Sequence, residues 1–259
     1  MRDALPTAAT SRDLGEHRLR DLARLEHVFQ LLHSERLENF PPLKSLDNLP
    51  NNLPRQLTSF IGREHEITEV KNLLATAYLL TLTGVGGCGK TRLALQVAVD
   101  LVEVFADGVW LIELANLSDP YLVPPAIATA LGVREEIASR GVGMGGPGIA
   151  TGQSADGSLL NRLIDFLQSK QALLLLDNCE HLLSACAQLA EALLRACPKL
   201  RILATSREAL GIAGERTYRV PSLSLPEPLH IPSLEILTQY EAVRLFIERV
   251  LFRVPSRFM

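Results

Sequence analysis

The stretch LLTLTGVGGCGKTRLAL, residues 79–95, decides the fold of this chain. It holds four glycines and one lysine within seven consecutive positions, between two apolar runs. Each glycine costs about 0.5–1 kcal/mol relative to alanine in regular structure, so something must approach this backbone closely. From Gly84 onward the spacing is G-x-x-x-x-G-K-[ST], the P-loop pattern that binds phosphate, and the pattern ends at Lys90 and Thr91.

The P-loop predicts how phosphate groups would be held. Successive backbone N–H groups wrap the β-phosphate, and the N-terminus of the following helix adds the positive end of its dipole. Lys90 is expected to reach the β- and γ-phosphates, and Thr91 to place its hydroxyl on Mg²⁺. A glycine-rich turn without a ligand is the structural alternative. The candidate binding residues of this segment are Gly84, Val85, Gly86, Gly87, Cys88, Gly89, Lys90, Thr91 and Arg92.

Two residues of this segment also have simpler interpretations. Arg92 fits a solvated charge on the first turn of the helix. Cys88 lies near a helix N-terminus, where a thiol is often reactive, but a small side chain that the loop tolerates explains it as well.

A second motif, LLLLDNCEHL at residues 173–182, predicts a buried strand that ends in a carboxylate. Asp177 at that end fits a Walker B acid that holds the magnesium through a water, although a cap or loop residue is the structural alternative. Many P-loop ATPases have a second carboxylate at the next position. Here that position is Asn178, whose amide does not accept a proton at neutral pH. Glu180 is the nearest substitute as a general base, and a first-turn acid facing a helix dipole is its structural alternative.

A third motif, LATSREAL at residues 203–210, ends another predicted strand with polar residues. Thr205 and Glu208 fit the capping box T-x-x-E, which predicts the start of a helix. Arg207 lies where a cation would read the γ-phosphate. The two interpretations are compatible because they use different side chains.

Strand-like and helix-like segments alternate through most of the chain. The predicted strands are residues 78–83, 109–114, 172–176, 201–205 and 217–220. The predicted helices are residues 64–75, 90–104, 122–131, 159–169, 181–197 and 241–250. This alternation predicts an α/β fold with a parallel sheet that is covered by helices on both faces.

Other segments frame or interrupt this pattern. Residues 1–40 are too few for a core of their own. Residues 41–57 are rich in proline and asparagine and predict an extended linker. Residues 141–157 carry seven glycines with almost no large apolar side chain, and they predict a mobile loop. The expected nucleotide-binding domain is residues 58–230, followed by the start of a truncated helical extension over 231–259.

Composition argues against several classes of function. The formal net charge is −3 and the pI is near 6.1, so neither nucleic acid nor an anionic membrane is an expected partner. The four cysteines show no C-x-x-C spacing, which argues against a zinc site. The N-terminus has no apolar signal segment, and no apolar run approaches the roughly 20 residues of a membrane span. We expect a cytoplasmic protein with reduced thiols.

Four blocks in this order resemble a known family. FIGRE (60–64), GVGGCGKTRLA (84–94), LLLLDNCEHL (173–182) and LATSREAL (203–210) are similar to the STAND-class, NB-ARC-type P-loop ATPases, and more closely to the predicted ATPases of bacterial multidomain regulators. The resemblance covers about residues 55–250. It implies a P-loop NTPase fold whose five-stranded parallel sheet is sandwiched by helices. Within that sheet, strand 201–205 would lie between the P-loop strand and the Walker B strand.

The same resemblance implies ATP or ADP with Mg²⁺ as cofactors, and it assigns roles to individual residues. Arg207 would occupy the sensor position on the fourth strand, and Thr91 and Asp177 would hold the metal. Asn178 departs from the acidic pair of eukaryotic NB-ARC proteins. The residues expected near adenine and ribose are Phe60, Ile61, Gly62 and Arg63.

Residues 13–31, DLGEHRLRDLARLEHVFQL, resemble the C-terminal end of a class III adenylate/guanylate cyclase domain. Only the last strands of such a domain would be present. The aspartates that bind metal in that family would lie upstream of Met1, so no cyclase activity is expected from this chain.

The leading hypothesis for function is a nucleotide-controlled switch in a bacterial signalling or transcriptional regulator. It would bind ATP or ADP with Mg²⁺, hydrolyse ATP slowly through Lys90, Asp177, Glu180 and Arg207, and act on neighbouring domains, protein partners or further copies of itself. A non-hydrolysing scaffold is one alternative, supported by Asn178. A phosphotransferase is another, but the insertion 141–157 contains no arginine for a lid over the phosphates.

Overall fold

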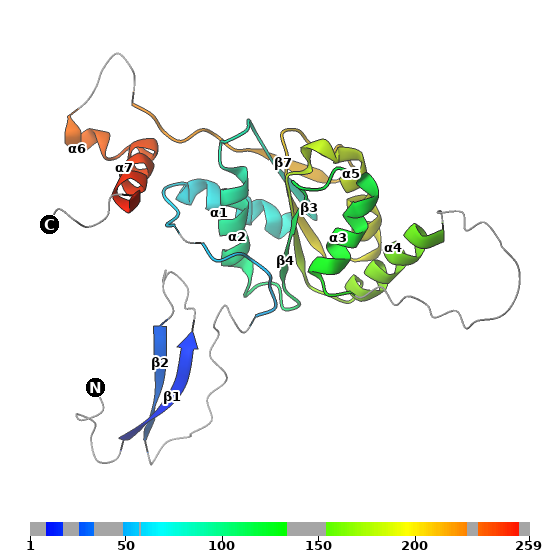
Figure 1. Ribbon diagram of the computed structural model, residues 1–259, viewed down its shortest axis with the longest axis horizontal. Coiled ribbons are helices and arrows are strands. Elements are labelled where there is room, and N and C mark those ends of the chain that lie inside the picture. Colours follow the sequence, from blue (N-terminus) through cyan, green and yellow to red (C-terminus); the bar gives the residue numbers. More distant parts are fainter. Residues whose placement is uncertain are drawn as a thin grey trace, which may run out of the picture.

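The computed structural model describes residues 9–17, 26–33, 49–56, 58–133, 154–226 and 233–253. Over these residues, five parallel strands form one sheet in the order β4-β5-β6-β3-β7 (Figure 1). The strands are β3 (Leu79–Thr83), β4 (Val109–Glu113), β5 (Leu173–Asp177), β6 (Arg201–Thr205) and β7 (Glu215–Arg219). The predicted α/β fold with a five-stranded parallel sheet is confirmed.

Helices cover both faces of this sheet (Figure 1). One face carries α1 (Glu64–Thr76) and α2 (Lys90–Leu101), and the other carries α3 (Val123–Ala130), α4 (Ser154–Leu167) and α5 (Leu183–Ala196). Successive side chains of a strand point to opposite faces. In β5, Leu173 and Leu175 therefore join the core under α1 and α2, and the two leucines that alternate with them join the other core. This burial on both sides explains why the strand is apolar at every position before Asp177.

The central position of β6 decides where the motifs meet. β6 pairs with β3 on one side and with β5 on the other, as predicted. The carboxyl ends of these three strands therefore lie next to one another at one edge of the sheet. Ligands of open α/β sheets bind at such an edge. The P-loop follows β3 and Asp177 ends β5, so both predicted motifs reach this edge.

Two predictions of local structure are wrong. Thr205 and Glu208 start no helix, because residues 206–214 form bends and turns and the hydroxyl of Thr205 bonds to Asp177 instead. Helix α4 begins at Ser154, inside the glycine-rich stretch 141–157 that was predicted as a loop. Residues 141–153 lie outside the described residues, so their predicted mobility stays a prediction.

Residues 49–53, within the predicted linker, lie along the outer edge of β4. The backbone N–H of Val109 donates to the carbonyl oxygen of Pro50 at 3.1 Å. Asn52 bonds to both backbone groups of Leu111: its Nδ2 donates to the carbonyl oxygen (2.9 Å), and its Oδ1 accepts from the N–H (2.6 Å). An open strand edge would leave these groups free for other chains. These contacts fix residues 49–53 to the sheet, and the extended linker over residues 41–57 stays a prediction.

Further elements lie on either side of the sheet domain in the sequence. β1 (Ala9–His17) and β2 (Glu26–His33) form an antiparallel pair. α6 (Leu234–Leu237) and α7 (Glu241–Arg253) lie in the predicted helical extension. The domain boundaries themselves stay predictions. Among the described helices, none combines the length and apolar character needed to cross a membrane.

Candidate functional site

Gly89 connects the glycine loop to α2. Its φ of 90° lies in the left-handed region, and a Cβ at this position would lie 3.2 Å from Nη1 of Arg63. Within the described part of the chain, no side chain caps the N-terminus of α2, which leaves its first N–H groups available to a ligand. A helix N-terminus of this kind attracts anions, and phosphate groups in particular.

Lys90 places a positive charge inside the curve of the loop. The residue is 9% exposed, and Nζ donates to the carbonyl oxygens of Gly84 (2.8 Å) and Val85 (3.1 Å). A buried ammonium group needs such polar partners, because burial without them is strongly unfavourable. The loop therefore holds this cation against its own backbone, beside the N-terminus of α2.

Asp177 lies at the centre of a hydroxyl cluster next to the P-loop. Its Oδ1 accepts hydrogen bonds from Oγ1 of Thr91 (2.8 Å) and from Oγ1 of Thr205 (2.6 Å). The hydroxyl of Thr205 in turn accepts from the backbone N–H of Asn178 at 2.9 Å. The predicted metal residues Thr91 and Asp177 are thus in direct contact. Thr205, which was predicted as a helix cap, is therefore a residue of this site. Its position at the end of the strand next to β5 was the signal that could have predicted its contact with Asp177.

The side chain of Asn178 contacts the turn that follows it. The residue has a left-handed φ of 67°, and its Nδ2 lies 3.4 Å from Nδ1 of His181. His181 Nε2 lies 2.7 Å from the carbonyl oxygen of Leu117. The amide side chain is therefore part of a local network on the turn η4 (Cys179–His181), and its chemistry gives it no role as a proton acceptor.

Glu180 and Arg207, both predicted as catalytic, are paired with each other. Nε of Arg207 lies 3.3 Å from Oε1 of Glu180, whose side chain is 20% exposed. The other carboxylate oxygen, Oε2, is buried and accepts no hydrogen bond from any described residue. Arg207 also lines a groove together with Thr83 and Gly84 of the P-loop region. Arg207 therefore lies near the glycine loop, and the carboxylate of Glu180 forms an ion pair with it.

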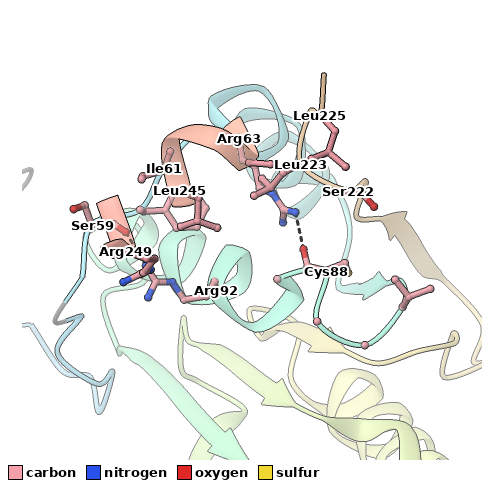
Figure 2. A pocket seen from close by; sticks show the side chains of 16 residues that line it. Ser59, Ile61, Arg63, Cys88, Arg92, Ser222, Leu223, Leu225, Leu245 and Arg249 are labelled. Carbon is pink, nitrogen blue, oxygen red and sulfur yellow. Dashed lines mark hydrogen bonds between the residues drawn. The ribbon is translucent and has the colours of Figure 1, made fainter. Parts of the chain in front are cut away.

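A cavity of about 480 Å³ lies beside the glycine loop (Figure 2). Phe60 and Ile61 line it from the segment before α1, and Leu245 lines it from α7. The loop residues Val85 to Gly89 form its floor. The cavity thus joins an apolar wall to a phosphate-binding backbone. Residues 60–63 and the loop residues were predicted as nucleotide contacts, but the parts of the wall from α7 and from Ser222, Leu223 and Leu225 were not predicted.

Arg63 lines this cavity but binds backbone groups of the protein (Figure 2). The residue is 5% exposed, and its Nη2 donates to the carbonyl oxygens of Cys88 (2.6 Å) and Pro221 (3.0 Å). Gly62, predicted beside it as a nucleotide contact, is not among the lining residues and packs against Glu241 instead. Arg63 therefore fastens the glycine loop to the segment that follows β7.

The interpretation of Arg92 as a solvated charge is wrong. Nη1 donates to Oγ1 of Thr58 at 2.8 Å, and Nη2 donates to the carbonyl oxygens of Thr58 (3.2 Å) and Ser59 (2.9 Å). Burial lowers the pKa of its guanidinium, the nearby charge of Arg249 lowers it further, and Glu248 opposes both. Arg92 and Arg249 lie close together in the cavity wall (Figure 2). Arg92 thus holds the segment before α1 onto α2.

The site joins a glycine loop, a buried lysine and a threonine–aspartate contact at the carboxyl edge of a parallel sheet. Residues 73–213, more than half of the 259-residue chain, match the family model described as the AAA domain. The chain belongs to this AAA domain family. Because this is a P-loop ATPase family, the glycine loop of the AAA domain is a nucleotide-binding element.

Several mycobacterial proteins are similar to this AAA domain chain. An uncharacterized protein of Mycobacterium tuberculosis (strain H37Rv) is 40% identical over 204 residues, which are 79% of this chain and 44% of that protein. A second protein of the same strain, which bears the name of an HTH-type transcriptional regulator, is 40% identical over 180 residues, or 70% of this chain and 17% of that protein. This chain therefore spans less than half the length of these relatives.

The solved structures to which this chain is similar are distant. A STAND protein (Signal Transduction ATPase with Numerous Domains) with a tetratricopeptide repeat sensor, from Pyrococcus horikoshii, has a TM-score of 0.39 at 14% identity, covering 62% of this chain and 23% of that one. The ORC2 protein of Aeropyrum pernix has a TM-score of 0.37 at 20% identity, covering 56% of this chain and 41% of that one. The family membership rests on the match over residues 73–213.

Proposed function

We propose that this chain is the nucleotide-dependent switch of a bacterial regulator, and that it binds ADP or ATP with Mg²⁺ and hydrolyses ATP slowly. One observation carries the proposal: Oγ1 of Thr91 lies 2.8 Å from Oδ1 of Asp177, immediately after the phosphate loop. A glycine loop alone binds an anion. A hydroxyl and a carboxylate that meet beside it are the ligand types that Mg²⁺ prefers.

The donor set fits a magnesium ion that is shared with a nucleotide. Within the described ranges, no three His, Cys, Asp or Glu side chains converge as metal ligands. Thr91 and Asp177 supply two oxygen groups, and phosphate oxygens would complete the set, as is usual for Mg²⁺. When bound, such an ion neutralises phosphate charge. Thr205 keeps Asp177 oriented through its 2.6 Å hydrogen bond.

The rest of the ligand fits the cavity. Phe60, Ile61 and Leu245 offer apolar surface to a base, and the loop from Val85 to Gly89 offers N–H groups to the phosphates. The ammonium of Lys90 would exchange its bonds to loop carbonyl oxygens for bonds to phosphate oxygens, which are stronger because both partners are charged.

Slow turnover follows from the groups around Asp177. An efficient ATPase needs a proton acceptor that orients the attacking water. Asn178 cannot accept a proton, and Glu180 is held by Arg207. A switch requires a protein that stays in one nucleotide state long enough to act on its partners. Its two states must differ in their contacts to the γ-phosphate, for which Lys90 and Arg207 are our candidates.

The regulatory context rests on relatives and on resemblance. The relative named as an HTH-type transcriptional regulator shares 40% identity with this chain. The order of the FIGRE, P-loop, Walker B and LATSREAL blocks supports the narrower STAND and NB-ARC assignment. We propose a cytoplasmic module that acts on other domains of its parent protein and associates with further copies in one nucleotide state.

The direct test measures nucleotide affinity with Lys90→Ala. Removing a buried charge that binds phosphate is expected to weaken both ATP and ADP by about 100-fold or more. Lys199→Ala, at an exposed lysine, is the matched control and should leave both affinities unchanged. Equal affinities of the Lys90 variant and the unmodified chain would end the assignment.

A non-hydrolysing scaffold is the second candidate, favoured by Asn178 and by the pairing of Glu180 with Arg207. Single-turnover hydrolysis of ATP separates the two proposals. Release of phosphate from bound ATP within minutes to hours supports the switch, and stable ATP over a day supports the scaffold.

A further inference from the structure

We infer that Glu241 is a positioning residue that fastens α7 to the phosphate loop, so that this helix controls how long a nucleotide stays bound. The inference rests on the proposed nucleotide binding and adds a residue far from the P-loop to it. Glu241 is the first residue of α7. Among the described residues, its hydrogen bonds go to Arg63 and Ser224, not to the glycine loop or Lys90.

The carboxylate of Glu241 bridges two segments. Its Oε1 accepts from the backbone N–H of Arg63 at 2.7 Å. Its Oε2 accepts from the backbone N–H of Ser224 (3.1 Å) and from Oγ of Ser224 (3.3 Å). In return, the Oγ of Ser224 accepts a hydrogen bond from the backbone N–H of Glu241 at 3.0 Å. The N-terminus of α7 is thus fixed to the start of α1 and to the segment after β7.

Arg63 carries the connection onward to the loop. Its backbone N–H is held by α7, and its guanidinium donates to the carbonyl oxygen of Cys88 inside the loop at 2.6 Å (Figure 2). The same guanidinium reaches the carbonyl oxygen of Pro221 at 3.0 Å. One residue therefore transmits the position of Glu241 to the backbone that is expected to wrap the phosphates.

The close approach requires glycine before Arg63. A Cβ on Gly62 would lie 2.3 Å from Oε1 of Glu241 and 2.8 Å from its Cδ. A side chain at position 62 would therefore displace the Glu241 carboxylate from this contact. The φ of +68° at Gly62 adds a second requirement for glycine. The G-R pair of FIGRE therefore serves the contact with α7 as well as the cavity.

Charge also favours this contact. Burial raises the pKa of the Glu241 carboxyl, but the hydrogen bonds from Ser224 and from the Arg63 N–H, together with the Arg63 charge, outweigh it and lower the pKa overall. The carboxylate stays ionised at neutral pH. Hydrogen bonds to an ionised acceptor are about twice as strong as neutral ones.

α7 in turn forms one wall of the cavity. Leu245 and Arg249 line it from this helix (Figure 2), together with Ala242. Ser59 donates a hydrogen bond to Glu248 further along the same helix. Release of Glu241 would loosen this wall and free the carbonyl oxygen of Cys88 from its fixed partner. Both changes open the cavity, so the main effect falls on the rate at which nucleotide leaves.

The experiment compares dissociation of fluorescent ADP from the full chain and from Glu241→Gln by stopped flow. We expect dissociation to be about tenfold faster in the variant. Ser224→Ala removes part of the same network without touching a charge and should give a smaller increase. Glu235→Gln, at an exposed glutamate of α6, is the matched control and should dissociate at the unmodified rate.

A second readout separates positioning from a general loss of stability. In the unmodified chain, bound ADP should slow amide hydrogen exchange in the first turn of α7. In Glu241→Gln, bound ADP should no longer slow this exchange. If the unmodified chain binds ADP and Glu241→Gln releases it at the same rate, the inference is overturned while nucleotide binding stands. If the unmodified chain binds no ADP, the proposed function fails as well.

Discussion

Thr91 and Asp177 are 86 positions apart in sequence, and their side-chain oxygens lie 2.8 Å apart in the structure. One belongs to the first turn of α2 and the other ends β5. The contact exists because β6 lies between β3 and β5, which brings the ends of the three strands together. Thr205, at the end of β6, donates a hydrogen bond to the same carboxylate oxygen.

The first prediction concerns the metal. Asp177→Asn removes the charge that would face Mg²⁺ while keeping the size of the side chain. In the unmodified chain, Mg²⁺ should raise the affinity for ATP, and in the variant this gain should fall by about tenfold or more. Titration calorimetry with and without EDTA measures the difference. Affinity without metal should change little, and a full magnesium effect in the variant would contradict the assignment.

The second prediction concerns Thr205. Thr205→Val keeps the shape but removes the hydroxyl that binds both Asp177 and the N–H of Asn178. Because the residue is 1% exposed, the unpaired groups should lower the free energy of unfolding by about 1–3 kcal/mol. Urea denaturation measures this. Thr76→Val, at an exposed threonine, should change it by less than about 0.5 kcal/mol; similar losses in both variants would show that Thr205 has no special role.

The third prediction uses two glycines of the same loop. Gly89→Ala places a Cβ at a φ of 90° and 3.2 Å from Nη1 of Arg63, and should destabilise the fold by about 1–2 kcal/mol. Gly86→Ala meets no described atom within 4 Å and should leave stability nearly unchanged. Thermal unfolding of both variants without nucleotide is the measurement. A larger loss at position 86 would contradict the loop geometry.

The fourth prediction concerns the pair of Arg207 and Glu180. If Arg207 reads the γ-phosphate, Arg207→Ala should weaken ATP by about tenfold and leave ADP within about twofold. Equal losses for both nucleotides would assign Arg207 a structural role.

Glu180→Gln tests whether Glu180 is the general base. The rate of single-turnover ATP hydrolysis should fall by about 100-fold if Glu180 accepts the proton, and should stay unchanged if Glu180 serves only as a partner of Arg207.

The fifth prediction is a pH dependence. The pKa of Glu241 is lowered from its ordinary value of 4.5, so its contribution to stability is fully present above that value and is lost as the pH falls through the lower pKa of the folded state. The melting temperature of Glu241→Gln should therefore lie below that of the unmodified chain at pH 7, and the gap should narrow below pH 4. A gap that stays constant between these pH values would show that the carboxylate charge is not what fixes α7.

The location of the phosphate loop was predictable from sequence because it depends on local pattern, whereas the place of β6 between β3 and β5 was expected only from the resemblance to a known family. The leucines of β5 are apolar at successive positions since both faces are covered, and the Gly89 conformation is required within the loop itself. The role of Arg92 was not predictable in this way. Its partners, Thr58 and Ser59, lie more than 30 positions away, and a charge on a helix looks solvated until another segment packs against it.

By itself, the sequence determined the P-loop, the Walker B strand and the alternating α/β architecture, because each depends on the spacing of residues along one short segment. Only the tertiary structure decided that Thr205 orients Asp177, that Arg63 fastens the glycine loop, and that Glu241 brings α7 to the cavity. These contacts join segments that are brought together by strand order and packing. A hydrogen bond between distant residues leaves no periodic pattern in the sequence.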